Sequence, residues 1–101
     1  MSVFEFDPIK SEKNRLKHGI DFVAAQEIWD DRRIIEAAAR GLTEPRFQVL
    51  GRAQGKLWSA VITYRPGSIR IISVRRARLS ERRKYEQEAR KKEIEAGGGG
   101  V

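Results

Sequence analysis

Residues 46–76 read RFQVLGRAQGKLWSAVITYRPGSIRIISVRR and contain the longest apolar segments of this chain of 101 residues. Three parts of this stretch alternate apolar and polar residues or run apolar, as strands do: 46–52, 57–65 and 68–76. Between them lie Gln54-Gly55 and Pro66-Gly67, pairs that favour tight turns. Strands with such short connections pair with their neighbours, so the stretch predicts an antiparallel meander.

The residues that open the chain predict a short strand and then a helix. Residues 3–6 form the strand, with its two phenylalanines on one face. Asp7 begins the helix by accepting from unpaired amides, and Pro8 stands where its missing N–H costs nothing. Gly19 ends this helix because glycine readily takes the left-handed conformation of a C-cap.

A second helix and a further strand precede the meander. Asp21 caps the helix, and its buried stripe has three- and four-residue spacing: Phe22, Ala25, Ile28 and Trp29. Residues 33–38 predict the strand. We therefore expect an α+β fold of order β-α-α-β-β-β-β-α, with the two N-terminal helices on one face of an antiparallel sheet.

The chain ends in a charged helix that starts at about Leu79. Arg78 precedes it and has no side-chain acceptor for the helix amides, so we expect Ser80 to cap and the helix to start later. Beyond Tyr85 the helix has little apolar surface, and we expect it either to fray or to be ordered by a protein partner. Residues 97–101 predict a flexible glycine-rich tail, so one domain spans 1–96.

Composition favours a polyanionic partner. The net charge is +7, and residues 68–96 contain ten Lys or Arg against five Glu. A basic surface concentrated in one region suits nucleic acid or an acidic protein segment, although a merely solvated surface is the plainer alternative. Without cysteine there is no disulfide or thiolate metal site, and we expect neither metal nor cofactor. The sequence shows no signal peptide or membrane-spanning run, and we expect a cytoplasmic protein.

Lys17-His18-Gly19 is the first candidate constellation. His18 falls in the last turn of the first helix, where exposed carbonyls favour a cation, and this suits a general acid or a phosphate contact. The alternative is that Lys17 and His18 only complement the helix end, with Gly19 as its cap.

The arginines of the last strand form the second constellation. Side chains alternate along a strand, so Arg70 and Arg76 share a face about 20 Å apart, while Arg75 points the other way unless a bulge intervenes at the strand end. These arginines are suited to successive phosphates, or alternatively to ion pairs with Glu44 or Glu81. Glu44 is the best candidate carboxylate base, although an ordinary exposed loop glutamate would look the same.

Aromatic residues offer possible stacking surfaces for bases: Trp29, Trp58, Tyr64 and Tyr85. The helical spacing of Trp29, and the strand parity that Trp58 and Tyr64 share with Ala60 and Ile62, favour positions in the core instead. Asp30-Asp31 is the only acidic doublet, and two adjacent side chains at a helix end diverge, so the pair makes a poor chelate.

Several segments together resemble the BrnT family of ribonuclease toxins from type II toxin–antitoxin systems. The likeness covers about residues 3–86, in the family's order and spacing. It is carried by F-E-F-D-P-x-K (4–10), N-R-x-K-H-G-I-x-F (14–22), D-D (30–31), E-x-R-F (44–47), L-G-R (50–52), R-I-I-S-x-R-R-A (70–77) and E-R-x-x-Y (81–85).

The resemblance implies a RelE-like fold, cleavage of RNA and neutralisation by a BrnA-like antitoxin. Such an antitoxin usually carries a ribbon-helix-helix part, through which the complex binds operator DNA and represses its own operon. The functional residues carried over by position are Lys17, His18, Glu44, Arg70, Arg75, Arg76 and Tyr85. We expect the catalytic residues to be Lys17, His18, Glu44, Arg70 and Arg76, and the RNA contacts to be Arg75, Arg46, Arg82 and Tyr85.

Cleavage of RNA without a metal can use the substrate's own 2′-hydroxyl as the nucleophile. Our hypothesis assigns Glu44 or Lys17 as base, the arginines of the last strand as phosphate stabilisers and His18 as acid. The alternative function is a non-catalytic module that holds nucleic acid or an acidic partner on the same basic surface. The nuclease hypothesis requires the cations of the first helix's end and of the last strand to meet in one patch.

Overall fold

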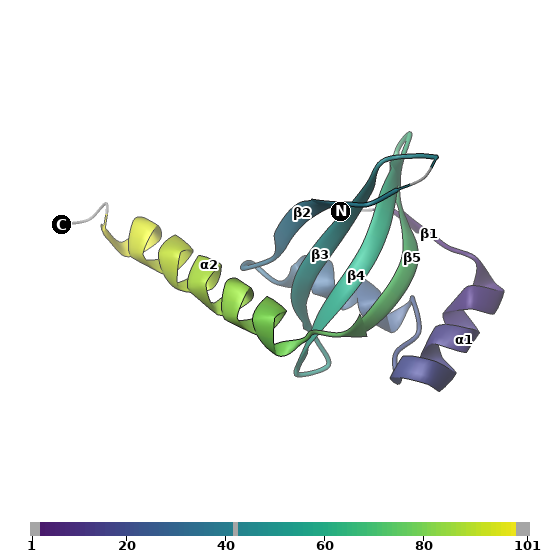
Figure 1. The fold of residues 1–101 in the computed structure, drawn as a ribbon, viewed down its shortest axis with the longest axis horizontal. Helices are drawn as coiled ribbons and strands as arrows, with labels where there is room; N and C mark the ends of the chain where they lie inside the picture. Colours follow the sequence, from purple (N-terminus) through teal and green to yellow (C-terminus); the bar gives the residue numbers. More distant parts are fainter. Residues whose placement is uncertain (1–2, 42, 99–101) are drawn as a thin grey trace.

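The meander forms as the sequence predicts. The computed structural model describes residues 3–41 and 43–98, and β3 (Arg46–Ala53), β4 (Lys56–Arg65) and β5 (Ser68–Arg76) follow one another as antiparallel neighbours (Figure 1). Gln54 and Gly55 take φ angles of 55° and 72° between β3 and β4, the left-handed pair that a tight hairpin requires. The predicted further strand is β2 (Ile35–Ala39), antiparallel to β3.

The sheet is mixed, and in this respect the purely antiparallel prediction was wrong. β1 (Phe4–Glu5) pairs with β5 in parallel, which gives five strands in the order β1-β5-β4-β3-β2. The meander leaves the outer edge of β5 free, and β1 occupies that edge while running in the same direction as β5. Hydropathy along one strand carries no information about such a distant pairing.

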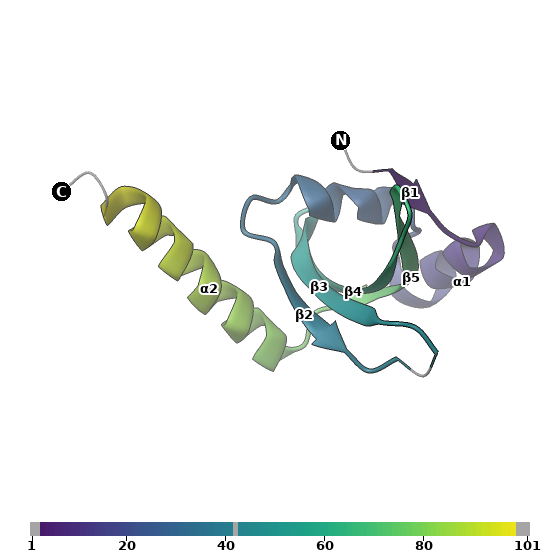
Figure 2. The same ribbon diagram turned by 90° about the horizontal axis from the view of Figure 1, so that it is seen from above.

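The first helix, α1 (Pro8–His18), has the predicted ends. The Asp7 carboxylate accepts from the backbone N–H of Ile9 at 2.8 Å, and Gly19 has a φ of 83°. Its buried residues are polar rather than apolar: Ser11 and Asn14. The Asn14 side chain accepts from the Val74 N–H at 3.2 Å, beyond the two residues of β5 that pair with β1. The helix therefore lies beside the edge of the sheet at β5, and the expectation that it covers a face was wrong (Figure 2).

The second predicted helix is η1 (Ala24–Asp30), and it is a 3-10 helix. Phe22, Ala25 and Ile28 are all fully buried at a spacing of three, which matches the three residues per turn of a 3-10 helix. It packs closely over β3, because a Cβ at Gly51 would lie 2.7 Å from the Ile28 side chain. One face of the sheet thus packs against η1 and forms the larger core (Figure 2).

The opposite face is covered only in part, by α2 (Leu79–Gly98), which then extends away from the sheet (Figures 1 and 2). Four residues form a smaller core there: Leu50, Leu57, Tyr85 and Ala89. α2 begins at Leu79, not later, because the Glu81 carboxylate accepts from the Arg78 N–H at 2.8 Å and supplies half of a capping box. Residues 97 and 98 belong to this helix, and the rest of the predicted tail lies outside the described residues.

Candidate functional site

A β-bulge in β5 determines which arginines share a face. The register passes from Val61↔Ser73 to Ile62↔Ile71, so one residue of β5 has no partner on β4. Arg70 and Arg75 therefore point to the same side, away from η1, and Arg76 points to the other. The expected pairing of Arg70 with Arg76 on one face was wrong, because the bulge lies within the strand and reverses the alternation.

Polar side chains occupy the part of the sheet opposite η1 that α2 leaves uncovered, which we call the open face. Phe47 pairs with Ile62, and one residue further the same register puts Arg46 next to Thr63. Thr63 pairs with Arg70, and Arg70 pairs with Glu5, which gives a row across four neighbouring strands. Arg65, Gln48, Ser73 and Arg75 complete the open face. Two buried hydroxyls, those of Ser59 and Thr63, also belong to this side of the sheet.

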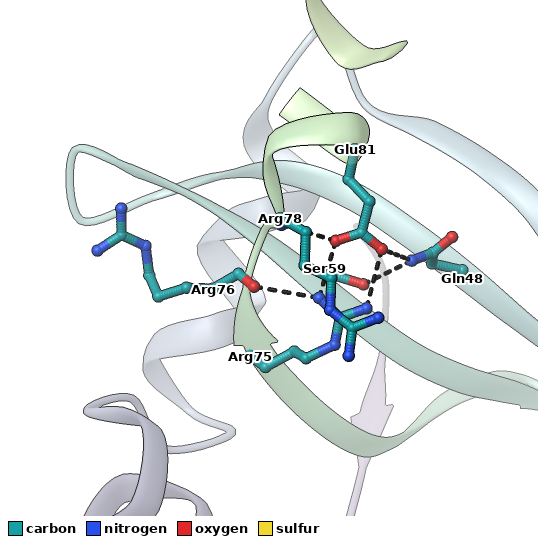
Figure 3. Close-up of polar contacts among 6 residues, drawn as sticks. All are labelled: Gln48, Ser59, Arg75, Arg76, Arg78 and Glu81. Carbon is teal, nitrogen blue, oxygen red and sulfur yellow. Dashed lines mark hydrogen bonds and ion pairs between the residues drawn. The ribbon is translucent and has the colours of Figure 1, made fainter. Parts of the chain in front are cut away.

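Arg75 is held by the start of α2 (Figure 3). Its two terminal nitrogens donate to the two oxygens of Glu81, both at 2.8 Å, and one of them also donates to the Arg76 carbonyl. Gln48 donates to Glu81 and to the Ser59 hydroxyl. The hydrogen bonds from Arg75, followed by those from Arg78 N–H and Gln48, lower the pKa of Glu81 to about 2 despite its partial burial. Of the two alternatives for Arg75, the ion pair is the one present.

Arg76 lies on the other side of the same strand end and is exposed. Its guanidinium carbon stands 5.5 Å from the centroid of the Trp58 ring, whose Nε1 donates to the Ala53 carbonyl. Among the described residues Arg76 forms no ion pair. The side chain is thus supported on an aromatic face, and its donors remain available.

His18 lies one helical turn after Asn14, on the stripe of α1 that also carries Ser11. α1 runs in the direction of β5, because Phe4 lies beside Ile69 and Asn14 bonds Val74. A further turn of about 5.4 Å brings His18 alongside the end of β5. The C-terminal ends of α1 and β5 accordingly lie at the same end of the sheet (Figure 1). Lys17 and His18 at the end of α1 and Arg76 at the end of β5 therefore lie toward the same end of the sheet, and we call these three residues the strand-end cluster.

Glu44 lies at the opposite end of β5. Its carboxylate pairs with Arg65 at 3.0 Å, and Arg65 pairs also with Glu5 at 3.4 Å. Arg70 pairs with the same Glu5 at 3.7 Å. The distance of about 20 Å from Arg70 to Arg76 along the strand separates this group from the strand-end cluster. The structure therefore does not bring Glu44 together with His18.

Tyr85 is in the smaller core and is 2 % exposed. Its hydroxyl donates to Asp31 at 2.6 Å, and burial together with this carboxylate raises the pKa of Tyr85 to about 12. Stacking on a base would require the ring to leave this position. Arg82 is exposed in the first turn of α2, close in sequence to the end of β5.

Several residues of this region were not identified from the sequence. They are Gln48, Ser59, Thr63, Glu81 as the acceptor shared by Arg75, Gln48 and the Arg78 N–H, and Asp31 as the partner of Tyr85. Strand alternation gives a signal for the first three, since polar residues recur within otherwise apolar strands. The link from Asp31 to Tyr85 spans 54 positions and has no local signal.

Two features are absent from residues 3–41 and 43–98. No group of three or more His, Asp or Glu side chains is placed to hold a metal ion. No helix there has the length and apolar character needed to cross a membrane.

Comparison with known proteins gives one match. A family model described as "Ribonuclease toxin, BrnT, of type II toxin-antitoxin system" matches residues 6–81. No curated protein matches the chain. The matched range contains both ends of β5, the strand-end cluster and the start of α2.

Proposed function

The chain belongs to the BrnT family of ribonuclease toxins of type II toxin–antitoxin systems, and we propose that it cleaves RNA without a metal ion, at the strand-end cluster. The observation that carries this proposal is the meeting of α1 and β5 at one end of the sheet. A histidine and a lysine at the end of α1, and an arginine without an ion pair among the described residues at the end of β5, lie toward that end, in a chain of a family of ribonuclease toxins.

The proposed reaction forms a bond from the 2′-oxygen to phosphorus and breaks the bond from phosphorus to the 5′-oxygen. Lys17 takes the proton of the 2′-hydroxyl, and His18 gives a proton to the departing 5′-oxygen. Arg76 donates to the phosphate oxygens as negative charge builds up on them. The products are a 2′,3′-cyclic phosphate and a 5′-hydroxyl.

This assignment uses Lys17 as the base in place of Glu44. Both were candidates from the sequence, but Glu44 is separated from His18 by most of the length of β5, and one phosphate cannot reach both. Arg75 contributes by fixing the backbone at the strand end, and Arg82 adds positive charge beyond it.

The test is incubation of the purified protein with matched RNA and DNA strands in the presence of EDTA. We expect the RNA to be cut to cyclic-phosphate ends and the DNA to survive, because DNA lacks the 2′-hydroxyl. His18→Ala should abolish cutting, while Lys91→Gln, a change of one exposed charge on α2, should leave it intact. RNA that is cut only after magnesium is added would end the metal-free mechanism.

We further propose a BrnA-like antitoxin as the protein partner, acting in the cytoplasm, and a RelE-like relationship for the fold. The toxin's contribution to repression is then indirect, with operator DNA bound through the antitoxin. The net charge of +7 supports an acidic partner segment. Mobility shift of operator DNA by the complex, but not by the toxin alone, is the expected result.

A further inference from the structure

The row of side chains across the open face suggests a second place where an anion can bind. Arg46, Thr63 and Arg70 are neighbours on three adjacent strands, and Arg65 lies two residues beyond Thr63 on β4. Three arginines here face only two carboxylates, those of Glu5 and Glu44. This group is about 20 Å from Arg76 along β5 and lies on the opposite face of the sheet, so it is separate from the strand-end cluster.

Arg46 differs from the other arginines of the open face. Arg65 and Arg70 are paired with Glu5, and Arg75 is paired with Glu81. Arg46 forms no ion pair with any carboxylate of the described residues, and its Nε is buried without a hydrogen-bond partner. A buried donor without a partner is unfavourable, so an anion that draws this guanidinium into a bond would be favoured.

The backbone and stem of Arg46 are held in place, although its guanidinium forms no ion pair within the described residues. The Thr63 hydroxyl donates to the Pro45 carbonyl at 2.7 Å and ties the start of β3 to β4. The loop before β3 packs on the arginine's stem, since a Cβ at Gly41 would lie 3.3 Å from its Cγ. A guanidinium presented from a rigid strand is well suited to bidentate contact with a phosphate.

We propose that Arg46, with Thr63 and Arg70 beside it, forms a second phosphate subsite for the same RNA strand whose scissile phosphate lies at the strand-end cluster; this rests on the proposed function. The ligand is a backbone phosphodiester and not a base, because Phe47 and Tyr64 point to the other face and Tyr85 is buried. The subsite therefore adds affinity for longer strands with no preference for sequence.

The test compares binding of a 2′-O-methyl uridine octanucleotide and a 2′-O-methyl uridine dinucleotide, followed by fluorescence anisotropy over a range of salt. Neither strand can be cleaved through a 2′-hydroxyl, so binding is measured whether or not the chemistry occurs. Only the octanucleotide is long enough to reach from the strand-end cluster to Arg46. Wild type should bind it more tightly than the dinucleotide by at least about tenfold.

Arg46→Gln should remove most of that advantage and reduce the salt slope of octanucleotide binding by about 0.7, the loss of one single-strand phosphate contact. Arg46→Lys should retain the slope and lose part of the affinity, because the charge stays while the fork is lost. Lys91→Gln is the matched control for charge and should leave both strands' binding as in wild type.

Equal behaviour of Arg46→Gln and Lys91→Gln would overturn the subsite and leave Arg46 to a protein partner or to stability. That result would not touch the proposed function, which depends on cutting of RNA in EDTA. A folded wild type that binds the octanucleotide through Arg46 but cuts no RNA would instead overturn the catalysis and keep the subsite.

Discussion

The two faces of the C-terminal end of β5 hold adjacent arginines in different ways. On the face toward the start of α2, Arg75 is clamped by both oxygens of Glu81, and its side chain is 31 % exposed. On the other face, Arg76 rests on the Trp58 ring, and its donors form no ion pair within the described residues. Neighbouring residues of the same type therefore serve different purposes: the first maintains the fold, and the second is available to a ligand.

The largest expected effect is that of replacing Arg76, whose donors form no ion pair within the described residues. Arg76→Gln should lower kcat on RNA by about 10²–10³-fold, the usual cost of one donor to a developing phosphate charge. Because Arg76 is exposed, the melting temperature should change little. Arg75→Gln should do the reverse, lowering the melting temperature while the folded fraction keeps most of its kcat. Equal losses of kcat in the two variants, after correction for the folded fraction, would remove the distinction.

The ion pair of Arg75 with Glu81 should make the stability of the fold depend on pH. The pKa of Glu81 falls from an ordinary 4.5 to about 2 in the folded protein. A depressed carboxyl pKa stabilises the fold above the unfolded value, so this contribution is complete above pH 4.5 and is lost as the pH falls through 2. It amounts to roughly 3 kcal/mol.

Urea denaturation of wild type and Glu81→Gln between neutral pH and pH 2 measures this contribution. The variant should be less stable at neutral pH, and its stability should fall less steeply below pH 4.5 than that of wild type. Parallel pH profiles for the two proteins would show that the clamp is not coupled to folding.

Much of the fold could be predicted because its signals are local. The Gln54-Gly55 turn, the Asp7 and Gly19 caps and the alternation of β3 to β5 each depend on residues a few positions apart. The parallel pairing of β1 and the position of α1 could not be predicted, because both result from competition for the free edge of β5. The 3-10 form of η1 was also not predicted. Phe22, Ala25 and Ile28 recur at a spacing of three, but together with Trp29 they were taken as the buried stripe of an α-helix.

The sequence supplied candidate residues for a site, but it did not predict how the fold arranges them. The pattern of cations along 68–76 was evident, but a single bulge decides which of them share a face. A bulge depends on how β4 and β5 fit together, and the side-chain pattern of β5 alone does not reveal it. The separation of Glu44 from His18 follows in the same way from the order of strands, which places the loop before β3 beside the β4–β5 turn.

The smallest expected effect concerns Tyr85 of α2. We predicted this residue as an RNA contact, but it lies in the smaller core, on the same side of the sheet as Arg75 and Glu81. Tyr85→Phe keeps the ring among Leu50 and Leu57 but removes its bond to Asp31. The loss should be about 1.5 kcal/mol of stability, the value of a hydrogen bond to a charged acceptor. Urea denaturation measures it, and hydrogen exchange should show faster opening of α2. Binding of the 2′-O-methyl octanucleotide should not change, because the hydroxyl points into the protein. Weaker binding with unchanged stability would mean that the ring leaves its buried position to meet RNA, and α2 would then belong to the active surface instead of the clamp.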